Sequence, residues 1–325
     1  MKKISMILLS LMLVGTLIFV AGCGSDSELK KEAKDYTPIE ERGYANPDAL
    51  ISAEDLQDIK DKDDVVVVDF RHIAKYKLGH VPGAVNVYRS DEENPNAEYG
   101  GMRATPKQME KMLQSRGINN GDLIVIYDDR GDYDASRMWW ILTMYGYDNV
   151  KLLDGGIVRW EALGYDTQIS TPDVEEGNFK FDRDEINEDK WLATVEDVKK
   201  AIDDKNTVIL DTRSEGEYTG AELKKGAERK GRIPTATWIE WKHAINGGKS
   251  EGIRTFKTAQ ELKKVYGSKG VTADKQIIPY CQSAVRSAHT TFVLTQLLGY
   301  EDVRNYDESW IGWSSREELP LEKDE

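Results

Sequence analysis

The chain has 325 residues, which corresponds to about two domains of ordinary size. Hydrophobic residues make up 39% of it, which is enough for two buried cores. Its 58 acidic and 44 basic residues give a net charge of −14, so the composition argues against a nucleic-acid-binding protein, and any site for an anion must be built locally.

Residues 1–22 have the features of an export signal. Two lysines precede an apolar stretch over residues 7–20, and two small residues then lead to Cys23. This arrangement is typical of a signal peptide, and the cysteine resembles that of a bacterial lipobox, where cleavage precedes the cysteine and its thiol receives a lipid. We therefore expect an exported protein, anchored through Cys23 to the outer face of the bacterial cytoplasmic membrane or to the periplasmic side of an envelope membrane. Residues 23–44 would then be the lipidated cysteine and a polar tether; an uncleaved membrane anchor is the alternative.

Cys23 and Cys281 are the two cysteines of the sequence. A lipid-modified Cys23 cannot form a disulfide, which leaves Cys281 as a lone thiol in an exported protein. Such a thiol is either a buried bystander or a reactive group, and its neighbours in the sequence help to distinguish the two.

The rest of the chain contains an internal repeat. The segment 146–160 matches 299–313 at a constant spacing, and Asp128 falls on Cys281 when this match is extended upstream without a gap. The second copy carries an insertion around residues 220–230. Because order and spacing are kept over this length, the match indicates two homologous domains rather than chance similarity.

The two predicted domains span residues 45–170 and 187–322, with a linker over 171–186. Ser52 and Thr194 stand at equivalent positions and have the pattern of helix N-caps. Continuous apolar runs predict strands that are covered on both faces. These runs are Val65–Val68, Ile124–Tyr127, Val208–Leu210 and Ile277–Tyr280. With helical segments between them, each domain is predicted to be α/β, with a mostly parallel sheet flanked by helices.

Cys281 lies where a predicted strand ends and a helix begins, which is the end of a parallel sheet at which ligands bind. The residues that follow it are predicted to form an anion-binding loop, whose backbone N–H groups would stabilise a thiolate and lower its pKa. This loop consists of Gln282, Ser283, Ala284, Val285, Arg286 and Ser287. Arg286 could add a fixed positive charge, and Ser287 could cap the helix. The alternatives are an inert buried cysteine and an arginine that points to solvent.

Three further motifs lie in the order that a known family would place them. Residues 79–86 read Gly-His-Val-Pro-Gly-Ala-Val-Asn, residues 211–218 begin Asp-Thr-Arg, and residues 306–310 read Tyr-Asp-Glu-Ser-Trp. Together with the repeat and the Cys281 loop, they resemble the tandem-domain rhodanese family of thiosulfate and 3-mercaptopyruvate sulfurtransferases. Glu308 departs from the family signature, where glycine is usual.

The resemblance implies a double-displacement reaction at Cys281. The thiolate would take the outer sulfur of a small anionic donor, of the thiosulfate or 3-mercaptopyruvate type, and become a persulfide. A thiol or cyanide would then remove that sulfur. The resemblance implies no metal ion and no organic cofactor, and the four histidines of the sequence have no metal-ligand spacing.

The residues that bind the donor are left open by the sequence. Arg213 could contact substrate, although its match, Arg71, lies in the domain without a cysteine and so favours a structural ion pair. Arg232 could likewise face the pocket. Glu217 stands where some thiosulfate sulfurtransferases carry a substrate-binding arginine, which leaves the identity of the donor open.

The first domain is predicted to be catalytically inactive because Asp128 cannot carry sulfur. We expect it to help close the cleft over Cys281. Arg130 and Arg137 could line the interface between the domains, or they could belong to a solvated loop.

Two other functions compete with sulfur transfer. A non-enzymatic, surface-anchored binding module could use the same fold, although the retained Cys281 loop argues against it. Cysteine-based phosphatases of this fold place five residues between the cysteine and the arginine. Here four residues separate Cys281 from Arg286, so the loop should be too tight for phosphate.

Overall fold

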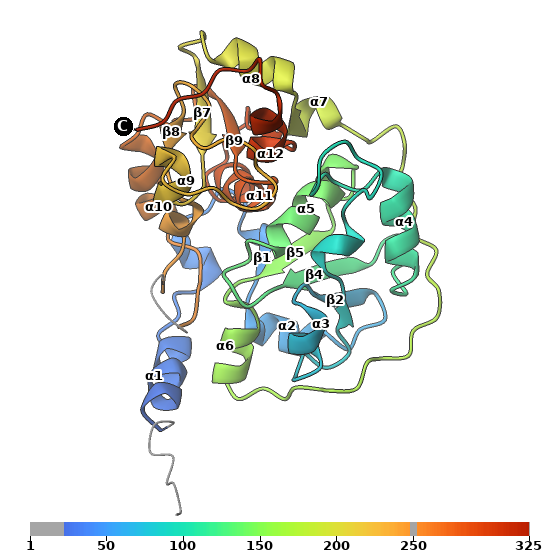
Figure 1. The fold of residues 1–325 in the computed structure, drawn as a ribbon. Coiled ribbons are helices and arrows are strands. Elements are labelled where there is room, and N and C mark those ends of the chain that lie inside the picture. The colour runs from blue at the N-terminus through green and yellow to red at the C-terminus, as the bar shows by residue number, and fades with distance from the viewer. Residues whose placement is uncertain (1–22, 248–251, 325) are drawn as a thin grey trace, which may run out of the picture.

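A computed structural model describes residues 23–247 and 252–324. The first domain is built on a parallel sheet with the strand order β1-β5-β4-β2-β3 (Figure 1). Its strands are β1 (Leu50–Ile51), β2 (Val65–Asp69), β3 (Val85–Asn86), β4 (Leu123–Tyr127) and β5 (Val150–Leu153). Its helices are α2 (Ala53–Ile59), α3 (Ile73–Tyr76), α4 (Pro106–Gln114), α5 (Ala135–Met144) and α6 (Gly156–Ala162).

The second domain repeats this arrangement. Strand β7 lies between β8 and β9, β10 pairs with β6, and a parallel bridge from Ile277 to Val303 joins the two sets. Its strands are β6 (Leu192–Ala193), β7 (Thr207–Asp211), β8 (Thr237–Trp238), β9 (Gln276–Tyr280) and β10 (Asn305–Tyr306). Its helices are α7 (Glu188–Trp191), α8 (Val195–Ala201), α9 (Glu215–Thr219), α10 (Ala259–Gly267), α11 (Val285–Phe292) and α12 (Ser309–Ser315). A π-helical turn (Val293–Leu297) continues α11, and short 3-10 helices span Ile39–Arg42, Pro47–Ala49, Arg89–Asp91 and Trp241–Ala244.

The strand order β8-β7-β9-β10-β6 corresponds to β3-β2-β4-β5-β1 of the first domain, which confirms the predicted α/β fold in two homologous copies. The two predicted helix N-caps, Ser52 and Thr194, are confirmed. The hydroxyl of Ser52 accepts a hydrogen bond from the N–H of Asp55 at the start of α2, and Thr194 caps α8 through Asp197 in the same way. The capping side chains satisfy N–H groups that the first turn of a helix leaves free.

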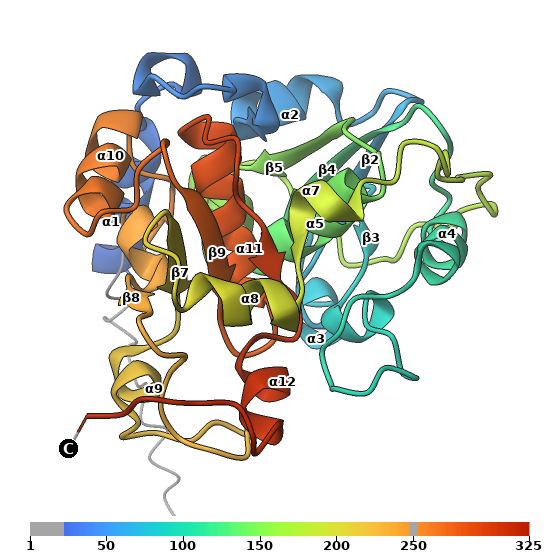
Figure 2. The same ribbon diagram turned by 90° about the horizontal axis from the view of Figure 1, so that it is seen from above.

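Helices α5 and α11 pack against each other where the domains meet and lie side by side in both views (Figures 1 and 2). The ring of Trp139 on α5 packs edge-on against Phe292 on α11, with their centroids 4.8 Å apart. Trp139 also packs against Trp191, at 5.7 Å. One hydrophobic cluster contains residues of both domains, so the two copies share a core.

The segment predicted as a tether is folded from the first residues that the structure describes. Helix α1 (Cys23–Lys34) packs on α6, and Ala33 is 1% exposed. After it, Arg42 forms an ion pair with Asp154 of the first domain and donates to the carbonyl of Phe256 in the second. Residues 23–44 were predicted to be a tether because most of their side chains are polar. The few side chains that are buried, Ala33, Ile39 and Tyr44, together with Arg42, attach this segment to both domains.

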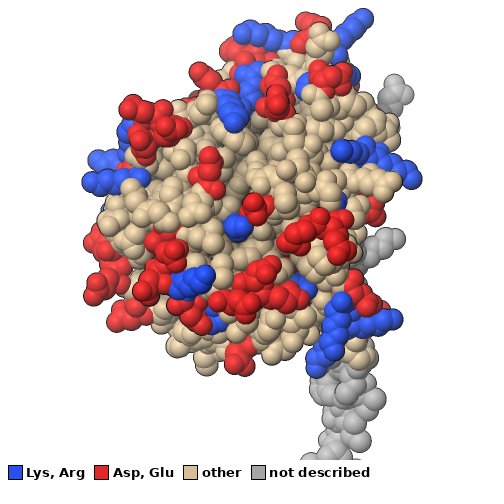
Figure 3. Space-filling model, turned by 180° about the vertical axis from the view of Figure 1, so that it is seen from behind, with Lys and Arg blue, Asp and Glu red and all other residues tan. Residues whose placement is uncertain are grey.

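The segment between the domains is likewise attached rather than free. The N–H of Gly177 donates to the carbonyl of Gln114, and Phe179 and Phe181 are buried against the first domain. The predicted signal peptide, residues 1–22, lies outside the described residues. One face of the surface carries a band of acidic side chains with fewer basic ones between them, in keeping with the net charge (Figure 3).

Candidate active site

Cys281 lies directly after β9 and before α11, at the carboxyl end of the second sheet. Its side chain is 1% exposed, and it has no disulfide partner among the described residues. Ala284 has a φ of 54°, in the left-handed region, so the chain turns tightly before α11 begins. The turn makes a short concave loop around the sulfur atom.

The loop directs hydrogen-bond donors at that sulfur. The backbone N–H groups of Ser283 and Ser287 face Cys281, and the buried hydroxyl of Ser287 makes no hydrogen bond to a helix N–H group. Ser287 therefore does not cap the helix as predicted. Ala284 occupies the N-cap position without a side-chain bond, because the left-handed turn starts α11 earlier than the sequence pattern suggested.

The surroundings of Cys281 change the pKa of its thiol. Burial would raise the pKa of Cys281, but the charge of Arg286 and the N–H groups of Ser287 and Ser283 together lower it below its usual value. Cys281 therefore ionises more readily than an ordinary cysteine, in a site that is almost closed to water.

Arg286 does not point to solvent. Its two terminal nitrogens donate to the carboxylate of Glu217 at 2.7 and 2.9 Å, and Glu217 is 2% exposed. Burial opposes ionisation of Glu217, but the bidentate contact with Arg286 and the hydroxyl of Ser214 lower its pKa to about 2. The pair fixes the guanidinium beside the sulfur, which Lys could not do in the same geometry.

Ser309, at the start of α12, supports the loop and was not singled out in the sequence. Its hydroxyl accepts hydrogen bonds from the N–H groups of Cys281 (3.1 Å) and Ala284 (3.0 Å) and donates to the carbonyl of Tyr306. It is the serine of the Tyr-Asp-Glu-Ser-Trp motif, so the sequence contained the residue but did not show that it binds the backbone of the Cys281 loop. Glu308, the unusual residue of that motif, pairs with Arg316.

The first domain has a loop of the same kind, in which a carboxylate takes the place of the thiol. One oxygen of Asp128 accepts from the N–H groups of Arg130 (2.7 Å) and Asp132 (2.9 Å). The other accepts from Asp134 (2.9 Å) and Ala135 (3.4 Å). The carboxylate thus uses the N–H donors of its own loop.

Arg137 connects the first domain to the catalytic loop. It is 1% exposed and forms an ion pair of 2.7 Å with Asp307 of the second domain. It also donates to the carbonyl of Gly101 at 2.9 Å and to that of Ala284 at 3.4 Å. The interface reading of Arg137 is therefore correct, and the first domain helps to hold the loop that carries Cys281.

Arg213 and Arg232 do not lie in the pocket. Arg213 is buried, pairs with Asp211 at 2.6 Å and donates to the carbonyl of Gly231. Arg71 makes the same contacts with Asp69 and Gly79, which supports the structural reading.

Arg232 binds the carboxy-terminal segment instead. Its guanidinium contacts Asp324 at 2.7 Å and Glu322 at 3.5 Å. The sequence could not show this because both acids lie far along the chain.

A cavity of about 580 Å³ opens beside Cys281. Its described lining combines the catalytic loop with residues of the first domain and of the insertion in the second. They are Arg89, Arg130, Tyr133, Glu217, Lys224, Trp241, Lys242, Arg254, Cys281, Gln282, Ser283, Val285 and Arg286. The insertion also contacts the loop directly, since the side chain of Gln282 donates to the carbonyl of Lys225.

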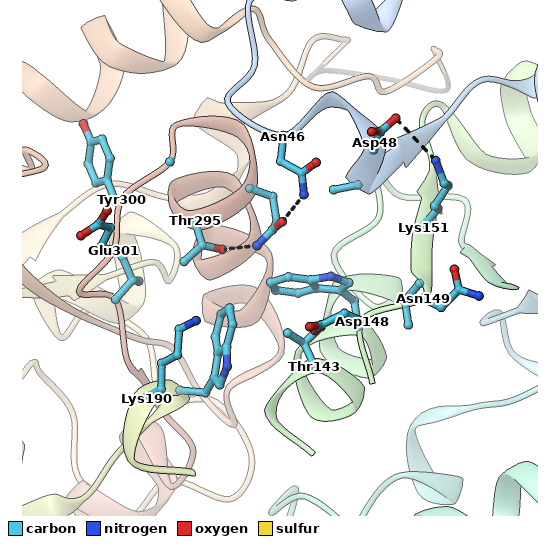
Figure 4. Close-up of a pocket in the computed structure, with 17 residues that line it drawn as sticks. Asn46, Asp48, Thr143, Asp148, Asn149, Lys151, Lys190, Thr295, Tyr300 and Glu301 are labelled. Atoms are coloured by element: carbon cyan, nitrogen blue, oxygen red, sulfur yellow. Dashed lines mark hydrogen bonds and ion pairs between the residues drawn. The ribbon is translucent and has the colours of Figure 1, made fainter. Parts of the chain in front are cut away.

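Another cavity, of about 760 Å³, lies where the corresponding corners of the two domains meet (Figure 4). Trp139, Thr143 and Asp148 come from the first domain, and Thr295 and Glu301 from the second. It shares no lining residue with the cavity at Cys281, and its described lining has no cysteine, serine or histidine. The candidate site for chemistry at a cysteine is therefore the Cys281 cavity. Within the described residues, no group of three His, Cys, Asp or Glu side chains could hold a metal ion.

Comparisons with known proteins agree with this geometry. Residues 52–163 and 194–316 each match the family described as the rhodanese-like domain. A putative thiosulfate sulfurtransferase of Saccharopolyspora erythraea is 34% identical, over 76% of this chain and 86% of that protein. The sulfur carrier protein TtuD of Thermus thermophilus is 33% identical, over 87% and 99%. A putative thiosulfate sulfurtransferase of Mycobacterium bovis is 32% identical, over 86% and 92%.

Solved structures share the fold. A variant of EanB in complex with ergothioneine aligns with a TM-score of 0.75 at 22% identity, over 86% of this chain and 71% of that one. The anaerobic ergothioneine biosynthesis enzyme of Chlorobium limicola aligns with a TM-score of 0.72 at 23% identity, over 87% and 72%. At this identity the likeness concerns the fold alone.

Proposed function

Because this chain belongs to the rhodanese family and is a sulfurtransferase, we propose that Cys281 is its sulfur-carrying residue and that the first domain carries no sulfur. The donor is a small anionic sulfur compound of the thiosulfate or 3-mercaptopyruvate type, and the acceptor is a thiol or cyanide. The observation that carries this proposal is the buried Cys281 thiol, whose pKa is lowered by Arg286 and by the loop N–H groups.

The reaction has two displacements. The Cys281 thiolate attacks the outer sulfur of the donor; a new S–S bond forms as the donor bond breaks, and the leaving group, sulfite in the case of thiosulfate, departs with the electron pair. An acceptor thiolate then attacks the terminal sulfur of the persulfide and leaves with it, which returns Cys281 as a thiolate. The N–H groups of Ser283 and Ser287 stabilise the anion in both states.

Phosphate transfer is disfavoured by the size of the loop. Four residues separate Cys281 from Arg286, and the guanidinium is already engaged on both terminal nitrogens by Glu217. With four residues between Cys281 and Arg286, the loop leaves less room for the oxygens of a phosphate group than a loop of five would. A pure binding module would have no need of a thiol with a lowered pKa.

The test is intact-protein mass spectrometry after incubation with thiosulfate or 3-mercaptopyruvate. The wild type should gain the mass of one sulfur atom, and cyanide should remove it. Cys281→Ser should gain nothing. A sulfur adduct that persists in Cys281→Ser would overturn the assignment, and an absence of any adduct on the wild type would favour the binding module.

We also propose that the protein is an exported lipoprotein anchored through Cys23. The support is the sequence of residues 1–22 and the cysteine that follows. Among the described residues, no helix is long and apolar enough to cross a membrane. Globomycin treatment and Cys23→Ala should each block processing and lipid attachment. Recovery of an unmodified, soluble mature protein from untreated cells would contradict the proposal.

A further inference from the structure

The cavity at Cys281 is a local region of positive charge in an acidic protein. Its described lining contains six basic side chains and one carboxylate, that of Glu217, which Arg286 already binds. The chain as a whole carries −14. The negative charge of the whole protein repels anions at long range. The six basic side chains at this cavity therefore indicate that the cavity binds an anion.

Two of the six cations come from the non-catalytic domain and are fixed there by one tyrosine. Arg89 and Arg130 donate to the phenol oxygen of Tyr133 at 2.7 and 3.0 Å. Their guanidinium groups also lie 5.4 and 6.0 Å from the centre of its ring. The ring itself packs on Trp241 of the second domain, with centroids 4.8 Å apart. Tyr133 thus holds two cations from separate segments at the wall of the cavity.

These two arginines differ in how far their charges are balanced. Arg89 donates to Asp134 at 2.5 Å. Arg130 has a carboxylate, that of Asp129, only at 3.7 Å, and Asp129 is also bound by Lys75. The side chain of Arg130 is 49% exposed. With five N–H donors on a guanidinium, Arg130 retains hydrogen-bonding capacity for a ligand.

The cavity is larger than transfer of one sulfur atom requires. Pockets for small organic ligands measure about 300–1,000 Å³, and this one measures about 580 Å³. A single sulfur atom at Cys281 leaves most of that space open, and the part of the lining that comes from the first domain consists of Arg89, Arg130 and Tyr133.

Resting on the proposed function, we propose that the preferred sulfur acceptor is a low-mass thiol that carries at least two carboxylates. Its thiolate takes the terminal sulfur of the Cys281 persulfide, and Arg130 and Arg89, positioned by Tyr133, bind the carboxylate farther from the sulfur. The inactive domain therefore determines specificity. In the balanced step, the acceptor S–S bond forms as the Cys281 S–S bond breaks, and Cys281 keeps the electron pair as a thiolate.

The experiment is a steady-state comparison of three acceptors with saturating thiosulfate: 2-mercaptoethanol, mercaptoacetate and mercaptosuccinate, which carry no, one and two carboxylates. Arg130→Gln should raise the KM for mercaptosuccinate about tenfold, the effect of losing one charge-assisted hydrogen bond. The KM for 2-mercaptoethanol and the kcat for each acceptor should change little. Because each variant is compared with the wild type on the same acceptor, differences in thiol reactivity cancel.

Three further variants sharpen the test. Arg130→Lys should restore part of the affinity for mercaptosuccinate, and Tyr133→Phe should weaken it while sparing 2-mercaptoethanol. Arg183→Gln removes a half-exposed arginine of the inter-domain segment that pairs with Glu110, and should match the wild type on all three acceptors.

Equal changes in KM for all three acceptors in Arg130→Gln would overturn the inference, because the arginine would then act on the site as a whole. So would an unchanged KM for mercaptosuccinate in Arg130→Gln. A wild type that takes no sulfur onto Cys281 from thiosulfate or 3-mercaptopyruvate, and transfers none to cyanide, would instead contradict the proposed function, and the inference with it.

Discussion

The loop at residues 128–134 and the loop at 281–287 stand at equivalent places in the two domains and differ in what fills them. Gly131 and Ala284 take the same left-handed turn. The N–H groups that face the sulfur of Cys281, those of Ser283 and Ser287, correspond to those of Arg130 and Asp134, which donate to Asp128. An anion-binding loop is therefore kept in both copies.

The two loops differ in how the anion is used. In the first domain the anion is a fixed carboxylate, and the position that corresponds to Arg286 holds Tyr133, which faces the active-site cavity of the other copy. In the second domain it is a thiolate with Arg286 and Glu217 beside it. The comparison shows that both copies of the fold supply N–H donors for an anion, whereas the thiol and the Arg286–Glu217 ion pair belong to the second copy.

The largest effect is expected from the substitution that tests whether only the Cys281 loop carries the reaction. Cys281→Ser should abolish sulfur transfer to cyanide, because a hydroxyl in its place cannot form a persulfide. Asp128→Asn should keep most of the activity. A discontinuous cyanide assay that detects thiocyanate measures both. Equal loss in the two variants would mean that the loops are not chemically distinct.

The next effect tests Arg286, whose place in the first loop is taken by Tyr133. Arg286→Ala should raise the pKa of Cys281 and slow transfer by about 10²–10³, the usual effect of removing one preorganised donor at a catalytic anion. Arg286→Lys should fall between it and the wild type, since it keeps the charge but not the two-pronged contact with Glu217.

The measurement is the rate of Cys281 alkylation by iodoacetamide as a function of pH. The curves should move to higher pH in the order wild type, Arg286→Lys, Arg286→Ala. Three superimposed curves would remove Arg286 from the mechanism.

A smaller effect tests how the second loop is held. Ser309 accepts from two loop N–H groups, and the equivalent residue of the first domain is Gly156, where a side chain would meet the carbonyl of Asp128 at 2.1 Å. Ser309→Ala leaves both N–H groups without this partner. We expect a loss of stability of about 1–3 kcal/mol and slower sulfur loading. Thermal unfolding and stopped-flow loading with thiosulfate would check it, and Ser315→Ala on the same helix is the control. A Ser309→Ala protein that loads sulfur at the wild-type rate would contradict this role.

The smallest effect concerns the carboxylate of the first loop. Burial, and then the charge of Asp134, raise the pKa of Asp128 to about 6 from 3.8, against the pull of the N–H groups. The folded protein thus holds this proton more tightly than the unfolded chain, so ionisation of Asp128 lowers the free energy of unfolding as pH rises from about 4 to about 6.

Asp128→Asn cannot ionise and should lose this pH dependence. The difference in stability, variant minus wild type, should grow over that range by at most about 3 kcal/mol. Carboxylates away from this loop, including Glu217, whose lowered pKa acts in the opposite sense, are common to both proteins and cancel. Asp132 does not cancel, because the charge of Asp128 helps to raise its pKa, and its response to the substitution adds to the difference in the same direction. Thermal unfolding at a series of pH values measures the difference. Parallel curves for the two proteins would show that Asp128 does not titrate in this range.

Much of the architecture follows from the sequence alone. The apolar runs predicted the central strands because both faces of a parallel strand are buried and leave a continuous hydrophobic signal. The caps at Ser52 and Thr194 were predictable because they depend on residues three positions away. The repeat located the second domain and aligned Cys281 with Asp128, so the sequence alone gave the candidate nucleophile and the contrast between the domains.

Only the tertiary structure decided what surrounds that nucleophile. The loop after Cys281 is contacted by three residues that lie far from it along the chain: Glu217, Ser309 and Arg137. They come from helices α9, α12 and α5, which converge on the loop, the last of them from the first domain. The sequence left Arg213 and Arg232 open as substrate-binding residues, because it does not show which carboxylate lies next to a charged side chain in the folded protein. The predicted tether followed the same rule: a segment that is mostly polar still folds onto the protein when the few side chains it buries, with Arg42, find partners in both domains.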